Sequence, residues 1–295
     1  VSTDNSNNFY LTGNAQTGFP TGAVTGNTSA YPTFQNGTTD AFVAKYNSSG
    51  VKQWSTFLGG SLADQGLAIK ATTNGMVYVT GITNVVGTGF PNTTGVTPGG
   101  QNDAFLTKFN SFGTQVWSTL RGGTLVEKGY GVTCDGASVY WVGSTTSTNF
   151  PTAGTPLQAS LGGGSGTDAF ICKMDTSTAA AIWATYLGGA NVDVAYSVCT
   201  YNTSTVNIGG STGSTTFPTS SPYQSTLGGG VAGTDDAFAL SMNADGTLPA
   251  GCTAPAVPTT PAGLNVVCQS QGGTYTTTAV SGATTYIWTC LLYTS

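Results

Sequence analysis

The sequence has no histidine and few charged side chains. Only 6% of its 295 residues are charged, and they include a single arginine, Arg121, and a single glutamate, Glu127. Serine and cysteine catalytic triads and the usual zinc sites need imidazole, so the composition excludes these chemistries. Six cysteines are too few for a disulfide scaffold in a chain of this length, and none lies in a Cys-x-x-Cys pair. We expect Cys134, Cys172 and Cys199 to be thiols buried in strands.

Basic patches and long apolar runs are absent as well. Seven basic residues stand against twelve acidic ones, for a net charge of −5, so no surface is expected to hold a nucleic-acid backbone. No stretch has the length of a membrane span or the residue order of a signal peptide. A surface poor in charge but rich in Thr, Ser and Asn is common outside the cell. Because the chain starts at Val1 without Met, we expect a piece of a longer secreted or cell-surface protein.

What the sequence has instead is a repeat built around the tripeptide Asp-Ala-Phe. Short apolar segments return in the same order in each copy, separated by turn signals such as Asn74-Gly75 and Asp135-Gly136. In three copies the fourth segment carries a tryptophan at a fixed interval before a Gly-Gly pair, and the last copy has lost both features. The aspartate anchors lie 63, 65 and 68 residues apart, and the repeated residues are Asp40, Asp103, Asp168 and Asp236, with Trp54, Trp117 and Trp183.

Four short strands per copy predict an all-β protein. Antiparallel strands joined by hairpins form a sheet that must stack on a neighbour to hide its Phe and Trp side chains. Units of this length that stack radially give a β-propeller, whereas a β-solenoid needs shorter coils and a sandwich would not repeat its sequence. We therefore expect a β-propeller of four-stranded antiparallel blades, about four of them in this chain, within a larger ring. The expected blades are residues 1–60, 61–123, 124–189 and 190–251.

These motifs carry a resemblance to a known family. They are Asp-Ala-Phe-Val-Ala-Lys-Tyr (40–46), Trp-Ser-Thr-Phe-Leu-Gly-Gly (54–60), Val-Tyr-Val-Thr-Gly (77–81) and the Phe-Pro pair of each insert. Over residues 1–250 the chain resembles the SBBP family, a β-propeller repeat of secreted bacterial proteins. The resemblance implies a ring of about seven blades in a large multidomain protein, often from Bacteroidetes-like bacteria, and no catalytic residues. The weak fourth strand of the last copy departs from the pattern and leaves ring closure open.

The sequence changes in character after the repeats. Residues 252–262 are typical of a proline-stiffened linker. Residues 263–295 resemble the opening strands of a PKD-like or Ig-like sandwich, without the further strands that would close a core. The abrupt end resembles the adapter read-through of metagenomic fragments, and the residues leave open whether Cys290 to Ser295 is genuine sequence.

Candidate catalytic groups are limited to one Glu and eleven Asp. Glycosidase chemistry needs two positioned carboxylates. However, the four repeat aspartates recur in every copy, and a structural bond to turn or neighbouring-blade amides explains such a residue better. The sialidase-type Asp box, Ser-x-Asp-x-Gly-x-Thr-Trp, does not occur. We therefore predict no catalytic residues.

Loops provide the remaining candidates. The Phe-Pro pairs lie in long inserts between the second and third strands, and their faithful repetition predicts that Phe90, Phe150 and Phe217 pack the inserts onto their blades. The connections between blades should share a face with these inserts, and loops on a rigid scaffold commonly bind ligands. No Asp-x-Asp-x-Asp loop is present, so no cofactor is expected, with Ca²⁺ as the alternative. The ligand-binding candidates are Asp64, Glu127, Lys128 and Asp193.

The leading hypothesis is a non-catalytic extracellular module that displays loops for adhesion, binding protein or carbohydrate at the cell surface. A rival is a structural spacer or assembly subunit that self-associates through open blade edges. A third is a polysaccharide-active enzyme that uses Asp or Tyr in the propeller channel. Two or more non-repeated carboxylates in a deep pocket would favour that enzyme.

Overall fold

The computed structural model describes residues 1–34, 37–84, 89–97, 99–163, 166–219, 222, 224, 226–228 and 235–249, without the side chains of residues 201 and 202. All of the regular secondary structure in this part of the chain is β-strand, which confirms the predicted all-β class. None of the described segments is a helix that could cross a membrane. The chain divides into two units, Val1–Thr219 with Gln224–Pro249 and Ser220–Tyr223 with Ala250–Ser295. The predicted linker and sandwich segment lie outside the described residues, and all the sheets belong to the first unit.

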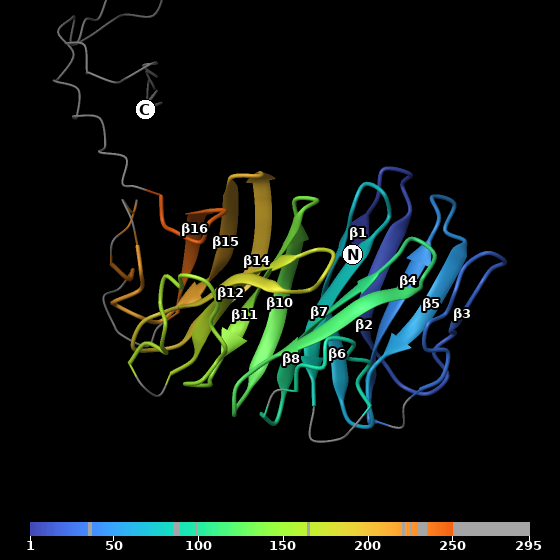
Figure 1. Ribbon diagram of the computed structural model, residues 1–295, viewed down its shortest axis with the longest axis horizontal. Helices are drawn as coiled ribbons and strands as arrows, with labels where there is room; N and C mark the ends of the chain where they lie inside the picture. Colours follow the sequence, from blue (N-terminus) through green and yellow to red (C-terminus); the bar gives the residue numbers. More distant parts are fainter. Residues whose placement is uncertain are drawn as a thin grey trace, which may run out of the picture. The chain divides into compact units, whose positions relative to one another are not determined.

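Four antiparallel sheets follow one another along the chain (Figure 1). The first has the strand order β1 (Ser2–Thr3), β2 (Phe9–Ala15), β4 (Asp40–Tyr46), β5 (Lys52–Leu58) and β3 (Gly22–Ala23). The second is β6 (Asp64–Ala71), β7 (Val77–Thr83), β8 (Asp103–Phe109) and β9 (Gln115–Arg121). The third is β10 (Glu127–Cys134), β11 (Ser138–Thr145), β12 (Asp168–Asp175) and β13 (Ala181–Leu187). The fourth is β14 (Asp193–Asn202), β15 (Thr205–Thr212) and β16 (Asp236–Asn243).

The first and fourth sheets depart from the predicted four strands. In the first, β3 comes from the Phe-Pro insert and pairs with β5, placing Gly22 opposite Ser55 and Ala23 opposite Trp54. The fourth sheet has three strands among the described residues. Its copy of β5, β9 and β13 would fall where Pro249 stands, and a proline cannot donate to a strand ladder.

Consecutive sheets stack face to face. We call the face that packs on the preceding sheet the rear face, and the one that packs on the following sheet the front face. Strand alternation places Val77 and Val79 on the rear face of β7 and Tyr78 on its front face. Buried apolar clusters fill the three junctions, and among the described residues none joins the first sheet to the fourth. The described residues therefore form an open stack of sheets.

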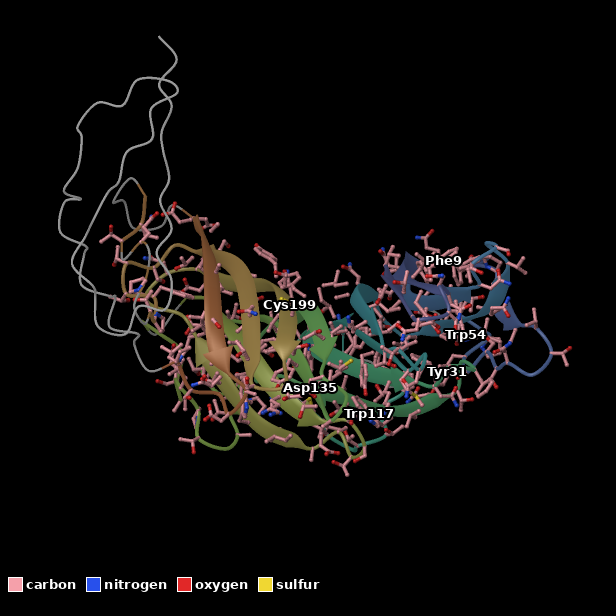
Figure 2. All side chains as sticks on the ribbon, turned by 90° about the horizontal axis from the view of Figure 1, so that it is seen from above. Phe9, Tyr31, Trp54, Trp117, Asp135 and Cys199 are labelled. Atoms are coloured by element: carbon pink, nitrogen blue, oxygen red, sulfur yellow. The ribbon has the colours of Figure 1, made fainter. Side chains whose placement is uncertain are left out.

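One edge of the stack is lined by the strands that begin the second, third and fourth sheets. We call β6, β10 and β14 the inner strands, because each contacts the next. On the opposite side of the first three sheets lie β5, β9 and β13, which contain the repeated tryptophans; β9 and β13 are edge strands, and β3 pairs outside β5. Figure 2 shows Cys199 of the inner strand β14 and Trp117 of β9 on opposite sides of the stack. The inner strands are thus an edge that the tryptophans do not reach.

The Phe-Pro inserts fold onto their own sheets. In each copy the insert phenylalanine packs on the phenylalanine of Asp-Ala-Phe. A glycine in the second strand makes room for that ring; a Cβ added at Gly143, for example, would lie 2.7 Å from the ring of Phe170. The ring pairs, with centroids 4.5 to 4.9 Å apart, are Phe19–Phe42, Phe90–Phe105, Phe150–Phe170 and Phe217–Phe238. These phenylalanines hold the inserts in place.

A lysine and a tryptophan close each junction by donating to one carbonyl of the next sheet. Lys108 Nζ and Trp117 Nε1 donate to the Thr176 carbonyl oxygen, at 2.8 and 2.9 Å. The Lys108 ammonium also lies 5.5 Å from the centre of the Tyr78 ring. We call this arrangement the Lys–Trp clasp. It recurs at the other two junctions, where Lys45 and Trp54 donate to Ser111, and Lys173 and Trp183 to Ala244.

The clasp predicts a stability cost for losing one indole N–H. Replacing Trp117 with Phe keeps an aromatic ring in the junction but removes the hydrogen bond to Thr176, so the free energy of unfolding should fall by about 1 to 3 kcal/mol. Urea denaturation measures the change. Val116→Ala on the same strand is the control, because Val116 is 47% exposed and should change the value by less than about 0.5 kcal/mol. An equal effect of the two changes would contradict a role for the clasp.

Candidate functional site

The predicted acidic ligands begin the inner strands and do not lie in open loops. Asp64, Glu127 and Asp193 are the first residues of β6, β10 and β14, and all three are buried. Each accepts a hydrogen bond from the second glycine of the preceding Gly-Gly pair, four residues earlier. The donor–acceptor pairs are Gly60 N with Asp64 Oδ2 at 2.7 Å, Gly123 N with Glu127 Oε2 at 2.8 Å and Gly189 N with Asp193 Oδ2 at 2.7 Å. The carboxylates thus close the tight turn that leads from one sheet to the next.

Each of these carboxyl groups lies beside a repeat aspartate. This repeat aspartate is the first residue of β4, β8 or β12 in the preceding sheet, and it is also buried. The first glycine of the Gly-Gly pair separates the two groups: a Cβ on Gly188 would lie 2.5 Å from Asp168 Oδ1 and 2.7 Å from Asp193 Oδ2. This crowding explains why glycine recurs there. The three carboxyl pairs are Asp40 with Asp64, Asp103 with Glu127, and Asp168 with Asp193.

Burial makes these pairs retain protons. Desolvation, then the nearby charge of Glu127, raise the pKa of Asp103 to about 8. Desolvation is also the main cause that raises the pKa of Asp64 to about 7 and that of Asp168 to about 6. At neutral pH Asp103 therefore holds a proton beside Glu127, whose other oxygen accepts the Thr145 hydroxyl at 2.6 Å.

The carboxyl pairs have the chemistry of an acid and a base but no access to a substrate. A general acid or base must reach the proton that it transfers, and these groups are buried under the turns between sheets. Within the described residues no group of three or more His, Cys, Asp or Glu side chains could hold a metal ion. Lys128, the remaining predicted ligand, is half-buried on β10 next to the first residue of that strand. The structure assigns the paired carboxyl groups a role at the junctions.

A different surface is exposed on the inner strands, and sequence reasoning missed it. Each inner strand has a β-bulge three residues after its acidic residue, and the bulged residue has no partner in the register. A bulge turns its side chain away from the regular alternation. The bulged residues are Leu67, Tyr130 and Tyr196, which we call the inner-strand row.

The inner-strand row consists of large side chains, and two of the three are exposed. Leu67 is 38% and Tyr196 is 52% exposed, and Tyr130 is half-buried. The two tyrosine rings contact each other, with centroids 5.3 Å apart. Burial raises the pKa of the Tyr130 phenol above its ordinary value. Exposed aromatic side chains of this kind mark binding surfaces more often than single apolar residues do.

The local sequence explains the bulge. The residue before it is small, because the inner strand runs against the second strand of the preceding sheet: a Cβ on Gly129 would meet the Thr80 hydroxyl and lie 2.6 Å from Trp141 Nε1. Gly66 and Ala195 hold the same position in the other inner strands. A four-residue sequence pattern could have revealed the row: an acidic residue, any residue, a small residue and then a large apolar one. This pattern begins at Asp64, Glu127 and Asp193.

The cysteines add one group to this surface. Cys172 is buried, as expected from the sequence, whereas Cys134 is half-buried and Cys199 is exposed on the inner strand β14 (Figure 2). The expectation of three buried thiols is therefore wrong for Cys199. An inner strand is the edge of its sheet, so its outward side chains lack the cover that the neighbouring sheets give to Cys172.

A cavity of about 450 Å³ lies between the hairpins of the second and third sheets. Lys70, Tyr78, Lys108 and Cys134 line it. Lys108 is engaged in the Lys–Trp clasp and lies over Tyr78. Burial raises the pKa of the Cys134 thiol, which keeps it in its less nucleophilic form. These groups serve the junction, so the inner-strand row remains the stronger candidate site.

Comparison with known proteins gives one short similarity. No family model matches the chain. A curated relative, the regulatory protein FlaEY of Caulobacter vibrioides, is 36% identical over 76 residues, which make up 26% of this chain and 8% of that protein. The chain therefore covers a small part of that relative's length. The 76 matched residues are only slightly longer than one repeat, since the repeat aspartates lie 63 to 68 residues apart.

The carboxyl pairs predict that stability falls as pH rises. The folded pKa values of Asp64, Asp103 and Asp168 lie above the unfolded value of about 3.9. At pH values between the unfolded and the folded pKa, the folded protein therefore binds more protons than the unfolded chain. The free energy of unfolding should therefore decrease from pH 5 to about pH 8, by roughly 1.4 kcal/mol per pH unit for each retained proton. Urea denaturation at several pH values measures the slope.

Asp103→Asn tests the origin of this slope. An amide can donate to Glu127 without a bound proton, so the variant should lose part of the pH dependence and match or exceed the unaltered chain at pH 8. Asp245→Asn is the control: Asp245 is exposed, and hydrogen bonds from Thr247 lower its pKa, so its charge does not change in this range. Stability that stays level or rises between pH 5 and pH 8 would refute the assignment.

Proposed function

We propose that this chain is a non-catalytic binding module of a larger secreted or cell-surface bacterial protein, used for adhesion to protein or carbohydrate. The stacked sheets form the scaffold, and the inner-strand row forms the contact surface. The observation that carries the proposal is the β-bulge repeated in β6, β10 and β14, which leaves Leu67 and Tyr196 exposed and Tyr130 half-buried beside Tyr196. A fold gains no core packing from an exposed tyrosine, so contact with a ligand explains it better.

The composition of the surface supports a neutral ligand. Charged residues are 6% of the chain, and the row itself consists of one leucine and two tyrosines. Tyrosine offers an apolar ring for stacking and a hydroxyl for a hydrogen bond, which suits both sugar rings and protein side chains. The contact of the Tyr130 and Tyr196 rings restricts their rotation, which lowers the entropy lost on binding.

Two other functions from the sequence receive less support. An enzyme would need carboxylates that a substrate can reach, and the carboxyl pairs are buried at the junctions. A spacer or assembly subunit needs no exposed aromatic row. The FlaEY protein is named as a regulatory protein, but the matched segment is only 8% of its length. A match this short supports a repeat unit common to the two proteins more than a common role.

Two substitutions test the row. After glycan and extracellular-protein arrays identify a ligand, Tyr130→Ala and Tyr196→Ala should each weaken binding by about tenfold or more, since buried aromatic contacts contribute 2 kcal/mol or more at the centre of interfaces. Isothermal titration calorimetry measures the change. Phe112→Ala is the matched control, because Phe112 is 57% exposed but lies in the turn between β8 and β9.

The same experiment separates the proposal from the spacer. Equal affinity of the Tyr130 and Phe112 variants would rule out the row as the contact surface. No binding on any array, together with filaments or oligomers under the electron microscope, would rule out the adhesion function and support a structural subunit.

A further inference from the structure

The cavity between the second and third sheets lies beside the clasp of that junction. Its walls are the turn between β6 and β7 and the turn between β10 and β11, with Tyr78 and Lys108 of the second sheet between them. Its volume of about 450 Å³ is that of a small-molecule site, for which roughly 300 to 1,000 Å³ is usual. Since the same junction is formed three times, the residues that differ at this one indicate what the cavity can hold.

At the first and third junctions, an aspartate binds the tyrosine of the clasp. The Tyr10 hydroxyl donates to Asp4 Oδ2 at 2.9 Å, and the Tyr140 hydroxyl donates to Asp135 Oδ2 at 3.2 Å. Each aspartate follows the first strand of its own sheet, in the turn to the second strand. Burial lowers the pKa of Lys45, and the charge of Asp4 opposes this shift. A carboxylate at this position thus serves both the tyrosine and the lysine.

Thr72 takes the place of this aspartate at the second junction. It follows β6, and its backbone N–H donates to the Met76 carbonyl oxygen at 2.8 Å, as that of Asp4 does to Asn8 at 3.1 Å. The two turns are therefore built alike. The Thr72 hydroxyl is bound within its own turn, at Met76. This position gives Tyr78 no carboxylate, and the cavity lies at this point of the junction.

Two lysines flank the tyrosine of this junction. Tyr78 lies between Lys70 and Lys108 in the register of β6, β7 and β8, so the three side chains share the front face. Lys108 gives one of its three N–H groups to the clasp. The Lys70 ammonium has no hydrogen-bond or ion-pair partner within the described part of the chain. Lys70 is particular to this copy, since Thr133 and Cys199 hold its position in β10 and β14.

Two acidic groups of the third sheet face these lysines, and both are engaged in their own turns. Asp135 lines the cavity, and its oxygens accept the Tyr140 hydroxyl and two backbone N–H groups of the turn. Burial lowers the pKa of Lys108, and the charge of Asp175 opposes this shift. Hydroxyl and backbone N–H groups of the following residues bind Asp175. The lining side chains carry two positive charges and one negative charge, in a chain whose net charge is −5.

We propose that this cavity binds a sugar acid, and that the ligand's carboxylate takes the place which an aspartate fills at the other two junctions. The carboxylate would accept hydrogen bonds from Lys70, Lys108 and the Tyr78 hydroxyl. That hydroxyl contacts the Thr176 side chain, and a carboxylate is a stronger acceptor than a hydroxyl. The cavity shares no lining residue with the inner-strand row, so the proposal does not rest on the proposed function.

The rest of the cavity suits the hydroxyl groups of a sugar. A carboxylate alone fills only a small part of about 450 Å³. Hydroxyl and amide side chains both donate and accept hydrogen bonds, as sugar hydroxyls do. Thr73 and Asn74 are exposed, so this wall of the cavity is open to solvent. The neutral polar side chains of the lining are Thr72, Thr73, Asn74 and Thr176.

An NMR titration of the isotope-labelled chain with glucuronate tests the proposal, with glucose as the uncharged sugar of the same ring. Glucuronate should shift the amide resonances of residues 70–76 and bind at least about tenfold more tightly than glucose, because glucose has no carboxylate for the lysines. Equal affinities for the two sugars, or shifts confined to other parts of the chain, would overturn the proposal.

Lys70→Gln should weaken glucuronate binding by about tenfold or more, because it removes the ammonium but keeps a side chain of similar length. Lys52→Gln is the matched control: it removes the same charge from β5, which contributes nothing to the cavity lining. An equal loss of affinity in the two variants would mean that only the net charge matters, and the cavity would not be the site.

Thr72→Asp supplies the carboxylate from the protein itself. The turn accommodates it, because Asn8 N donates to Asp4 Oδ1 at 3.0 Å in the matching turn. The variant should have a higher urea midpoint and should no longer bind glucuronate, while Thr72→Asn, of similar shape without the charge, should keep part of the binding. Unchanged binding by a folded Thr72→Asp variant, or equal loss in both variants, contradicts the proposal. Lys70→Gln carries the test if Thr72→Asp does not fold, since Lys70 is unpaired.

Further ligands identify the source of the sugar acid. Oligogalacturonate that binds more tightly than galacturonate indicates an acidic polysaccharide, and equal affinity indicates a free sugar acid. Acetate or inorganic phosphate that binds as tightly as glucuronate would show a site for any small anion, which would overturn the assignment to a sugar acid.

Discussion

The contact on which this structure depends is the one between the front face of one sheet and the rear face of the next. A small sheet with apolar residues on both faces cannot bury them alone, so each repeat is stable only within a stack. The Lys–Trp clasp fixes how the sheets meet, because two donors from one sheet converge on a single carbonyl of the next turn. Apolar area supplies the attraction, and the clasp sets the register between sheets.

The carboxyl pairs are the second constraint. Burying two carboxyl groups side by side is costly unless one of them keeps its proton or both are hydrogen-bonded. Asp103 and Glu127 meet this condition with a retained proton and with hydrogen bonds from Gly123 and Thr145. The glycine between them carries no side chain because both groups occupy that space. The connection between sheets is therefore short and fixed, and the inner strands start at a defined point.

Function in such an array depends on positions that the junctions leave free. The bulge of each inner strand is one such position, because Leu67 and Tyr196 are exposed there and Tyr130 is only half-buried, against Tyr196 of the next sheet. Its backbone is the same in all three strands, while the residue changes from Leu67 to Tyr130 and Tyr196. A regular scaffold thus presents a variable surface, which is the arrangement expected of a binding repeat.

The sequence by itself determined the all-β class and the repeated strands, since alternating apolar residues and Gly turns are local signals. It also pointed to Asp103 and Trp117 as repeated residues, but not to their partners, because Glu127 and Thr176 lie in the next sheet. Only the tertiary structure paired the carboxyl groups and exposed Tyr196 and Cys199. Pairing and exposure depend on which surfaces the stacking covers, and the short acidic, any, small, large apolar pattern at each bulge does not by itself say which side chain the stacked sheets leave exposed.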